Sequence, residues 1–266
     1  MADGRRSAAT AEMSTAAMRE WRALLAALLY FTRLPLPIRT PLEADDWRRA
    51  TSWWPLVGIG VGAATGGVLI LAGAALPPTI AAGLSLGLGL LLTGAQHEDG
   101  FADSCDGFGG GGPDRARVLE IMRDSRVGAF AVVGLIVLLG LKWLALGEMH
   151  APWLLAAPIA AAALSRAAAA ALMAVLSYAR TEPSRAAPVT SRLRGGRLAL
   201  PLLLGLLPLL ALPAGPAFAC AGVAITVWAV AAAWLSRRLG GYTGDCLGAT
   251  QQIAEVALLL TLVASL

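Results

Sequence analysis

Residues 53–76 read WWPLVGIGVGAATGGVLILAGAAL and contain no charged side chain. A helix needs about 20 apolar residues to cross the hydrocarbon core of a bilayer, so this run is long enough for one span. Glycine recurs within it, at Gly58, Gly60, Gly62 and Gly66, and small residues allow helices to approach closely in lipid. The run therefore predicts a transmembrane helix that packs against another helix.

Further apolar runs of similar character follow along the chain. They lie near residues 78–96, 127–147, 152–176, 198–213, 216–235 and 250–266. Hydrophobic residues make up 57% of the 266 residues and charged residues 14%, against roughly 25% charged in soluble domains. This composition excludes a soluble domain and a disordered chain, and the long continuous runs disfavour a β-barrel. We expect an all-α, polytopic membrane bundle of about seven transmembrane helices.

The N-terminal region is expected to lie outside the hydrocarbon core. Trp21–Phe31 is apolar but short and has arginines on both sides, a pattern that indicates an interfacial helix. Residues 1–17 are polar and rich in Ala, Ser and Thr, which favours a disordered tail. Residues 18–266 are then expected to form a single membrane-embedded domain.

Arginines alternate from loop to loop. They gather before the first span and in the loops around residues 115–126, 180–197 and 237–238. The intervening loops, near Pro77, residues 148–151 and Pro213, contain no Lys or Arg. By the positive-inside rule, the N-terminus and the arginine-rich loops lie in the cytoplasm. The arginines of the cytoplasmic loops account for the net charge of +4. We therefore expect the lipid bilayer as a partner and no nucleic acid. Whether the protein forms a homo-oligomer stays open.

Acidic residues concentrate in the loop after the second expected span. The string HEDGFADSCDG covers residues 97–107 and places Asp99, Asp103 and Asp106 at positions i, i+4 and i+7. On a helix this spacing puts three carboxylates on one face, where they repel each other unless a cation lies between them. Mg²⁺ prefers oxygen ligands and is held by one or two carboxylates together with substrate phosphates. We predict a Mg²⁺ site formed by these three aspartates, with His97 as a ligand, a base or a structural donor.

A second polar cluster precedes the third expected span. It contains Arg123, Asp124, Ser125 and Arg126. Arginine is a natural bidentate partner of phosphate, so Arg123, Ser125 and Arg126 are candidate phosphate-binding residues. An ordinary basic cluster at the membrane border is the alternative.

A third group lies near the last expected span. Thr243 and Asp245 stand at its start, where helix capping could also explain them. Glu255 and Arg166 lie deeper, in apolar surroundings where charges are costly and usually functional, and Arg166 is the expected partner of Glu255. Lys142 is expected to reach the membrane surface with its long side chain. The residues alone thus indicate a Mg²⁺-dependent, cytoplasm-facing site for transfer between phosphate esters.

These motifs together resemble the cobalamin synthase family, whose members are also called adenosylcobinamide-GDP ribazoletransferases. The resemblance covers residues 21–266 in order and is carried by His97–Gly107, Glu120–Arg126, Gly240–Gly248, FTRLP at 31–35 and WPLVG at 54–58. Glu98 departs from the apolar residue expected between the His and the Asp of the first motif.

The resemblance implies a reaction and roles for the candidate residues. α-Ribazole, or its 5′-phosphate, attacks adenosylcobinamide-GDP through a ribose hydroxyl. GMP leaves, and adenosylcobalamin or its phosphate forms. The expected location of the protein is the bacterial inner membrane. Asp99, Asp103 and Asp106 would hold Mg²⁺, and His97, Asp124 and Asp245 would be the catalytic candidates. Substrate contacts would come from Arg123, Ser125, Arg126, Arg166, Thr243 and Glu255.

Two other functions remain open from the residues. A CDP-alcohol phosphotransferase-like lipid enzyme would share the metal site, but Phe108–Gly111 stands where that family's motif continues with Ala-Arg. A cation transporter would need charged residues in several spans, and only Arg166, Glu255 and Lys142 lie deep within them.

The predicted topology can be tested by labelling. A single cysteine at Gly111, in a chain whose three natural cysteines are replaced, should react with a membrane-impermeant thiol reagent only from the cytoplasmic side. Inside-out vesicles and intact spheroplasts give the two arms of the measurement. Labelling of intact spheroplasts would contradict the topology.

Overall fold

The computed structural model describes residues 2–37, 41–180, 189 and 193–266, and every regular element in that part of the chain is a helix. The elements are α1 (Ala2–Phe31), α2 (Ala44–Ala50), η1 (Thr51–Trp53), α3 (Trp54–Gly73), α4 (Pro78–Thr93), α5 (Gln96–Gly110), α6 (Arg115–Ile121), α7 (Ala129–Gly147), α8 (Trp153–Val175), α9 (Gly196–Leu206), η3 (Leu207–Ala211), α10 (Ala214–Leu239) and α11 (Gly244–Val263). The expected all-α fold is therefore confirmed.

Five stretches of the described chain are long and apolar enough to cross a membrane. They are Ala44–Gly73, which ends in α3, and the helices α7, α8, α10 and α11. Helices α4 and α5 qualify together as a sixth, broken span, because they are bent by 89° at a short break. The polytopic architecture is as expected, but the number of spans is five or six in place of seven.

Two of the seven expected runs fall short of a span. Residues 78–96 reach span length only together with α5, and the other shortfall is at residues 198–213. There the chain forms α9 and the 3₁₀ turn η3, which together cover Gly196–Ala211 and are shorter than a full span. Pro201 lies inside α9, and Pro208 follows its end. A proline lacks the N–H that continues a helix and clashes with the preceding turn, so this apolar run does not become a long helix.

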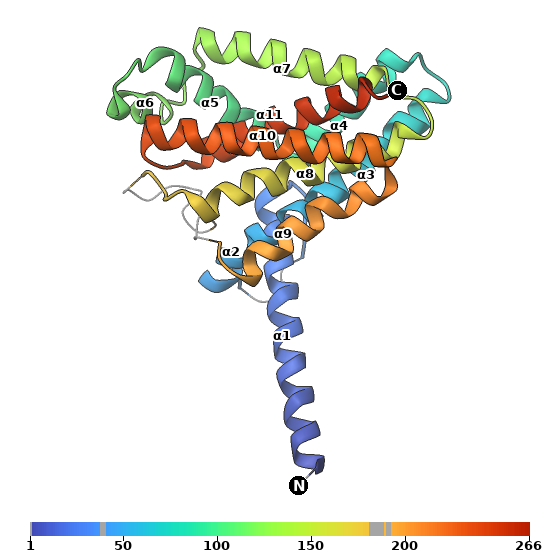
Figure 1. Ribbon diagram of the computed structural model, residues 1–266, viewed down its shortest axis with the longest axis vertical. Coiled ribbons are helices and arrows are strands. Elements are labelled where there is room, and N and C mark those ends of the chain that lie inside the picture. Colours follow the sequence, from blue (N-terminus) through green and yellow to red (C-terminus); the bar gives the residue numbers. More distant parts are fainter. Residues whose placement is uncertain (1, 38–40, 181–188, 190–192) are drawn as a thin grey trace.

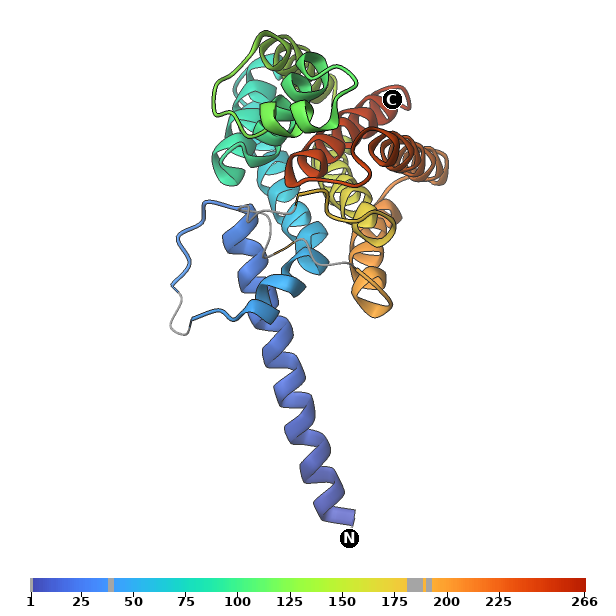
Figure 2. The same ribbon diagram turned by 90° about the vertical axis from the view of Figure 1, so that its left-hand side faces the viewer.

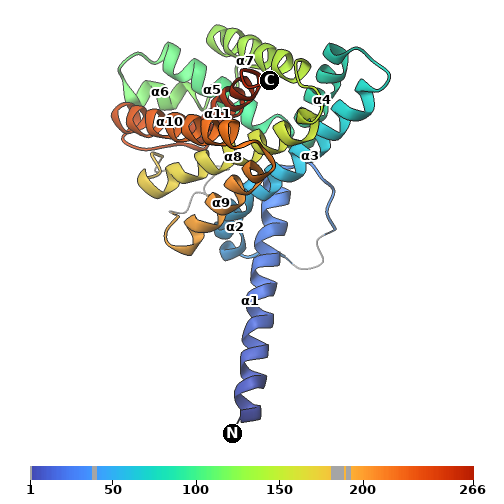
Figure 3. The same cartoon turned by 45° about the vertical axis from the view of Figure 1, so that its right-hand side comes forward.

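Helix α1 runs crosswise to α7 and α10 and leads away from the bundle (Figures 1 and 3). Its direction suits the interfacial helix expected for Trp21–Phe31, and the helix extends back to Ala2, where the sequence favoured a disordered tail. The blue helix in Figure 2 touches the bundle only with its C-terminal half. Arg22 anchors it there through a 2.7 Å ion pair with Asp46 of α2.

Helix α8 lies at the centre of the bundle and is buried along most of its length. Helix α3 approaches it through the glycines that the sequence singles out. A Cβ atom at Gly58 would lie 2.5 Å from the carbonyl oxygen of Ala162, and one at Gly62 would lie 2.6 Å from the Cα of Ile159. Gly66 makes an equally close approach. The two backbones therefore touch directly, as expected for glycine-rich helices in lipid.

Two further glycines bring α5 against the start of α11. A Cβ atom at Gly100 would lie 3.0 Å from the Cα of Asp245, and one at Gly248 would lie 3.1 Å from the carbonyl oxygen of His97. The chain reaches this position through the sharp bend after α4, where Gly94 and Ala95 both adopt left-handed backbone conformations. The acidic helix is thus folded back onto the last span.

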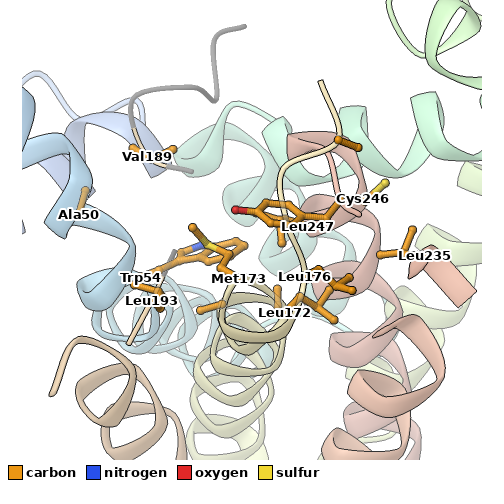
Figure 4. Close-up of a cluster of buried hydrophobic side chains, with 14 of the residues drawn as sticks. Ala50, Trp54, Leu172, Met173, Leu176, Val189, Leu193, Leu235, Cys246 and Leu247 are labelled. Atoms are coloured by element: carbon orange, nitrogen blue, oxygen red, sulfur yellow. The ribbon is translucent and has the colours of Figure 1, made fainter. Parts of the chain in front are cut away.

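An apolar core lies where α3, α8, α10 and α11 meet (Figure 4). Trp54, Met173, Leu235 and Leu247 contribute side chains from the four helices, and Leu193 joins them from the segment before α9. Among the described residues that follow α8, Leu176, Ala179, Val189 and Leu193 belong to this core.

The contact of α3 with α8 generates a stability prediction. Gly62→Val should lower the free energy of unfolding by about 1–3 kcal/mol, because the added side chain overpacks a backbone contact. Gly60→Val lies on the exposed face of the same helix, where a Cβ atom would meet no other atom within 4 Å, and should change it far less. Thermal denaturation of both variants in detergent measures the difference, and equal midpoints would contradict the close contact.

Candidate active site

A cavity of about 960 Å³ opens beside α5 and the start of α11. Small-molecule sites typically occupy ~300–1,000 Å³, so there is room for a large substrate. Its charged lining residues are Arg33, Asp99, Asp103, Asp106, Arg123, Asp124, Arg126, Arg180 and Asp245. Carboxylates and guanidiniums thus face the same space, a combination suited to a metal ion and phosphate groups.

The three aspartates of the acidic string all lie on α5 and line this cavity, as their helical spacing predicts. The side chains of Asp99 and Asp103 accept no hydrogen bond from any described residue. Asp106 differs, because it accepts hydrogen bonds from the backbone N–H groups of Gly128 (2.6 Å) and Ala131 (2.9 Å) at the start of α7. Asp106 therefore acts as a helix cap as well as a wall of the cavity.

Asp245 joins these aspartates from α11. The Arg180 guanidinium donates a 2.6 Å hydrogen bond to its carboxylate, and the Thr243 hydroxyl lies 3.2 Å away. Thr243 itself is the N-cap of α11, since its hydroxyl accepts a hydrogen bond from the Cys246 N–H. Thr243 is fully buried and does not line the cavity, so the capping alternative explains Thr243 but not Asp245.

Arg180 is a cavity residue that the sequence pattern does not reveal. A short parallel pairing holds it in place: the Ala179 N–H donates to the Tyr242 carbonyl (2.8 Å), and the Tyr242 N–H donates to the Ser177 carbonyl (3.0 Å). Gly241 permits this approach, because a Cβ atom there would collide with the Ser177 carbonyl. No sequence signal links residues 177–180 to residues 241–242, so from the sequence Arg180 is only one of several loop charges.

The segment from Arg123 to Arg126 lies along the cavity, and its role in phosphate binding stays a prediction. Within it, the Arg126 guanidinium hydrogen-bonds Asp124 and lowers the pKa of that carboxyl to about 2. Asp124 is therefore ionised, but it is a weak proton acceptor while the pair persists. Tyr30 also lines the cavity, and burial raises the pKa of its hydroxyl to about 12, so this hydroxyl stays neutral.

Arg166 and Glu255 do not line the large cavity. They border a second, smaller chamber of about 40 Å³, hereafter the chamber, between α3, α4, α5, α7, α8 and α11. Arg166 donates to the carbonyl of Ala162 in its own helix (2.8 Å), and Glu255 pairs with Lys142 at 3.2 Å. The expected Arg166–Glu255 pair is thus replaced by a Lys142–Glu255 pair, and Lys142 is 5% exposed and does not reach the membrane surface.

His97 lies in the wall between the two cavities and borders both. Its ring stacks with Trp54 at a centroid distance of 5.6 Å. The side chain is 3% exposed, and neither ring nitrogen has a hydrogen-bond partner among the described residues. The imidazole therefore has two unpaired nitrogens, both of them buried, at the edge of the acidic site.

The carboxylates can be compared with the needs of a Mg²⁺ ion. In the described part of the chain, no three His, Cys, Asp or Glu side chains converge as ligands of a single ion. Asp99 and Asp103 nevertheless offer unused oxygens toward the cavity, whereas those of Asp106 are engaged. Because Mg²⁺ commonly uses one or two carboxylates and takes its other ligands from phosphate and water, the residues fit such an ion.

Comparison with known proteins adds independent evidence. The family model for cobalamin-5-phosphate synthase matches residues 23–263. Three relatives bear the name adenosylcobinamide-GDP ribazoletransferase: that of Ralstonia nicotianae is 44% identical over 94% of this chain and 98% of its own length, that of Ralstonia pickettii 43% over 93% and 98%, and that of Vibrio cholerae serotype O1 38% over 91% and 93%. No solved structure matches the chain.

Proposed function

The chain belongs to the cobalamin-5-phosphate synthase family, and on that premise we propose that it joins adenosylcobinamide-GDP to α-ribazole, or to α-ribazole 5′-phosphate, with release of GMP. The large cavity is the observation that supports this assignment. Three carboxylates and three guanidiniums line it together: Asp99, Asp103, Asp245, Arg123, Arg126 and Arg180. Such a site accommodates a pyrophosphate with its counter-ions. A CDP-alcohol phosphotransferase is not favoured, because the matching relatives bear the ribazoletransferase name.

The reaction exchanges one phosphorus–oxygen bond for another. A ribose hydroxyl oxygen of α-ribazole attacks the phosphorus that stays with the corrinoid. The bond from this phosphorus to the bridging oxygen breaks, the electron pair leaves with GMP, and the hydroxyl proton passes to a base. The protein must therefore bind two substrates side by side, exclude competing water and accept one proton.

Arginines at the cavity wall supply the phosphate contacts. Arg123 and Arg126 stand on the segment before α7, with Ser125 between them, and Arg180 lines the same cavity from the segment that follows α8. Guanidiniums bind phosphate oxygens through paired hydrogen bonds. A phosphate that binds here competes with Asp124 for Arg126 and with Asp245 for Arg180, so substrate binding would release these carboxylates.

Asp99 and Asp103 would hold Mg²⁺, with Asp106 at the edge of the site. When bound, the ion supplies charge neutralisation on the bridging and leaving oxygens. The candidate proton acceptors are His97 and Asp245; the low pKa of Asp124 makes it a weak acceptor until a bound phosphate displaces it from Arg126. The ring nitrogens of His97 are not engaged by described residues but are buried, so His97 would have to turn toward the cavity to accept the proton.

The apolar helices make a multi-pass membrane protein, and the relatives are bacterial. We place it in the cytoplasmic membrane with the cavity open to the cytoplasm. The arginine-rich loops support this orientation by the positive-inside rule, and a nucleotide-linked substrate requires it.

Replacement of one aspartate tests the metal site. Asp103→Asn keeps the shape of the side chain but removes a charge, and it should abolish GMP release or raise the Mg²⁺ concentration needed for it at least tenfold. Asp114→Asn is the matched control, since Asp114 caps α6 and asparagine caps equally well. GMP release from adenosylcobinamide-GDP and α-ribazole, titrated with Mg²⁺, measures both. Wild-type behaviour of Asp103→Asn would show that the metal site is wrong.

The Asp124–Arg126 pair leads to a pH prediction. Because the pKa of Asp124 is about 2, this carboxyl carries its charge throughout the range from about pH 5 to pH 9 and does not titrate there. Asp124→Asn should therefore leave the acid limb of the pH–rate profile where it lies in the wild type, whatever its effect on the maximal rate. A shift of that limb by more than about half a pH unit would make Asp124 the titrating base.

A further inference from the structure

We propose that Lys142 is a positioning residue, which acts through Gln252 and Glu98 to hold the first turn of α5 so that Asp99 and Asp103 face the cavity. The inference rests on the proposed metal site at these aspartates. It concerns the chamber on the other side of the same helix turn.

Helix α5 needs an external restraint. It follows a bend of 89° with two successive left-handed residues, Gly94 and Ala95, so the preceding helix does not fix its rotation. Where α5 meets α11 at Gly100, there is no side chain to interlock with a neighbour, and the bonds that Asp106 accepts from the start of α7 lie about two turns beyond Asp99. A rotation of this first turn would carry the aspartates away from the cavity.

Glu98 supplies a restraint next to the first aspartate. Successive residues of a helix point about 100° apart, and the structure divides them between two spaces: Asp99 lines the large cavity and Glu98 lines the chamber. The Gln252 side-chain amide donates a 2.8 Å hydrogen bond to Glu98 Oε1. Holding Glu98 in the chamber therefore holds Asp99 in the cavity.

Lys142 determines which way the Gln252 amide faces. Its ammonium group can only donate, and it lies 2.8 Å from Gln252 Oε1. The amide oxygen must therefore face Lys142, which turns the amide nitrogen toward Glu98. Lys142 Nζ also lies 3.6 Å from Glu98 Oε1, so the charge supports the same arrangement.

The location of Lys142 points to a specific role. It is the only charged residue of α7 and is buried at membrane depth, where an ionised side chain is costly. A buried ion pair is weak evidence for stability, since apolar replacements are often as stable. The hydrogen bonds that run from Lys142 through Gln252 to α5 give this charge a function that an apolar residue could not replace.

A second branch of the network offers a matched control. The Gln251 amide donates to Glu255 Oε2 (2.7 Å) and to the Ser165 hydroxyl (3.0 Å), and neither of these residues belongs to α5. Gln251 and Gln252 are adjacent, equally buried glutamines of α11. Replacement of either by leucine removes one buried amide, and the Gln252 amide also donates to Gln251 Oε1 (2.9 Å). Only Gln252→Leu removes the hydrogen bonds that link Lys142 to Glu98 through a side chain, which leaves the 3.6 Å contact between the two charges.

The experiment measures Mn²⁺ as a spectroscopic substitute for Mg²⁺. Electron paramagnetic resonance of free Mn²⁺ gives the dissociation constant for purified, folded protein without any turnover. Lys142→Met and Gln252→Leu should each weaken Mn²⁺ binding by about tenfold, as loss of a residue that orients a metal ligand typically does. Their double variant should be no weaker than either alone, and Gln251→Leu should stay within about twofold of the wild type.

The positioning role of Lys142 would be overturned by unchanged Mn²⁺ affinity in Gln252→Leu. Equal losses of Mn²⁺ affinity in Gln252→Leu and Gln251→Leu would also overturn it. If Lys142→Met does not fold, the two glutamine variants still decide it. A wild-type protein that binds Mn²⁺ but releases no GMP would refute the proposed function alone, whereas a wild type without Mn²⁺ binding would overturn the positioning role with the metal site.

Discussion

Direct backbone contact between α5 and the start of α11 is the interaction on which the candidate site depends. Gly100 and Gly248 leave no side chain between the two helices, so Asp245 comes to lie in the same cavity as Asp99 and Asp103. The acidic residues of one helix would otherwise end in a loop at the membrane border. Because the contact is made of backbone atoms, neither helix can move toward the other, and the width of the acidic site is set by the main chain.

The same helix turn separates two kinds of polar environment. On one side, carboxylates and guanidiniums face a cavity large enough for a nucleotide-linked substrate. On the other, Lys142, Glu98, Glu255 and Arg166 surround a chamber with space for only a few water molecules. Substrate chemistry and charge burial are thus kept apart, with His97 at the boundary between them.

Local patterns in the sequence predict the helices and the acidic face correctly, because hydrophobic run length and the i, i+4, i+7 spacing are properties of neighbouring residues. Partners across the fold are harder to predict. Residue type alone pairs Arg166 with Glu255, whereas the distance between helices gives Lys142 that place. Arg180 depends on a pairing between residues 177–179 and 242 that no local pattern encodes, and the prolines of α9 interrupt a run whose hydropathy alone suggests a span.

The bonds from Asp106 to the start of α7 have a further consequence. They close a loop of 22 residues that contains α6 and the arginine segment, and they fix both ends of that loop at the aspartate helix. For a loop with fixed ends, doubling its length costs only about 0.6 kcal/mol in closure entropy. A change of length in the exposed turn between α5 and α6 therefore need not displace the aspartates, whereas one between Arg123 and Arg126 would move the proposed phosphate contacts.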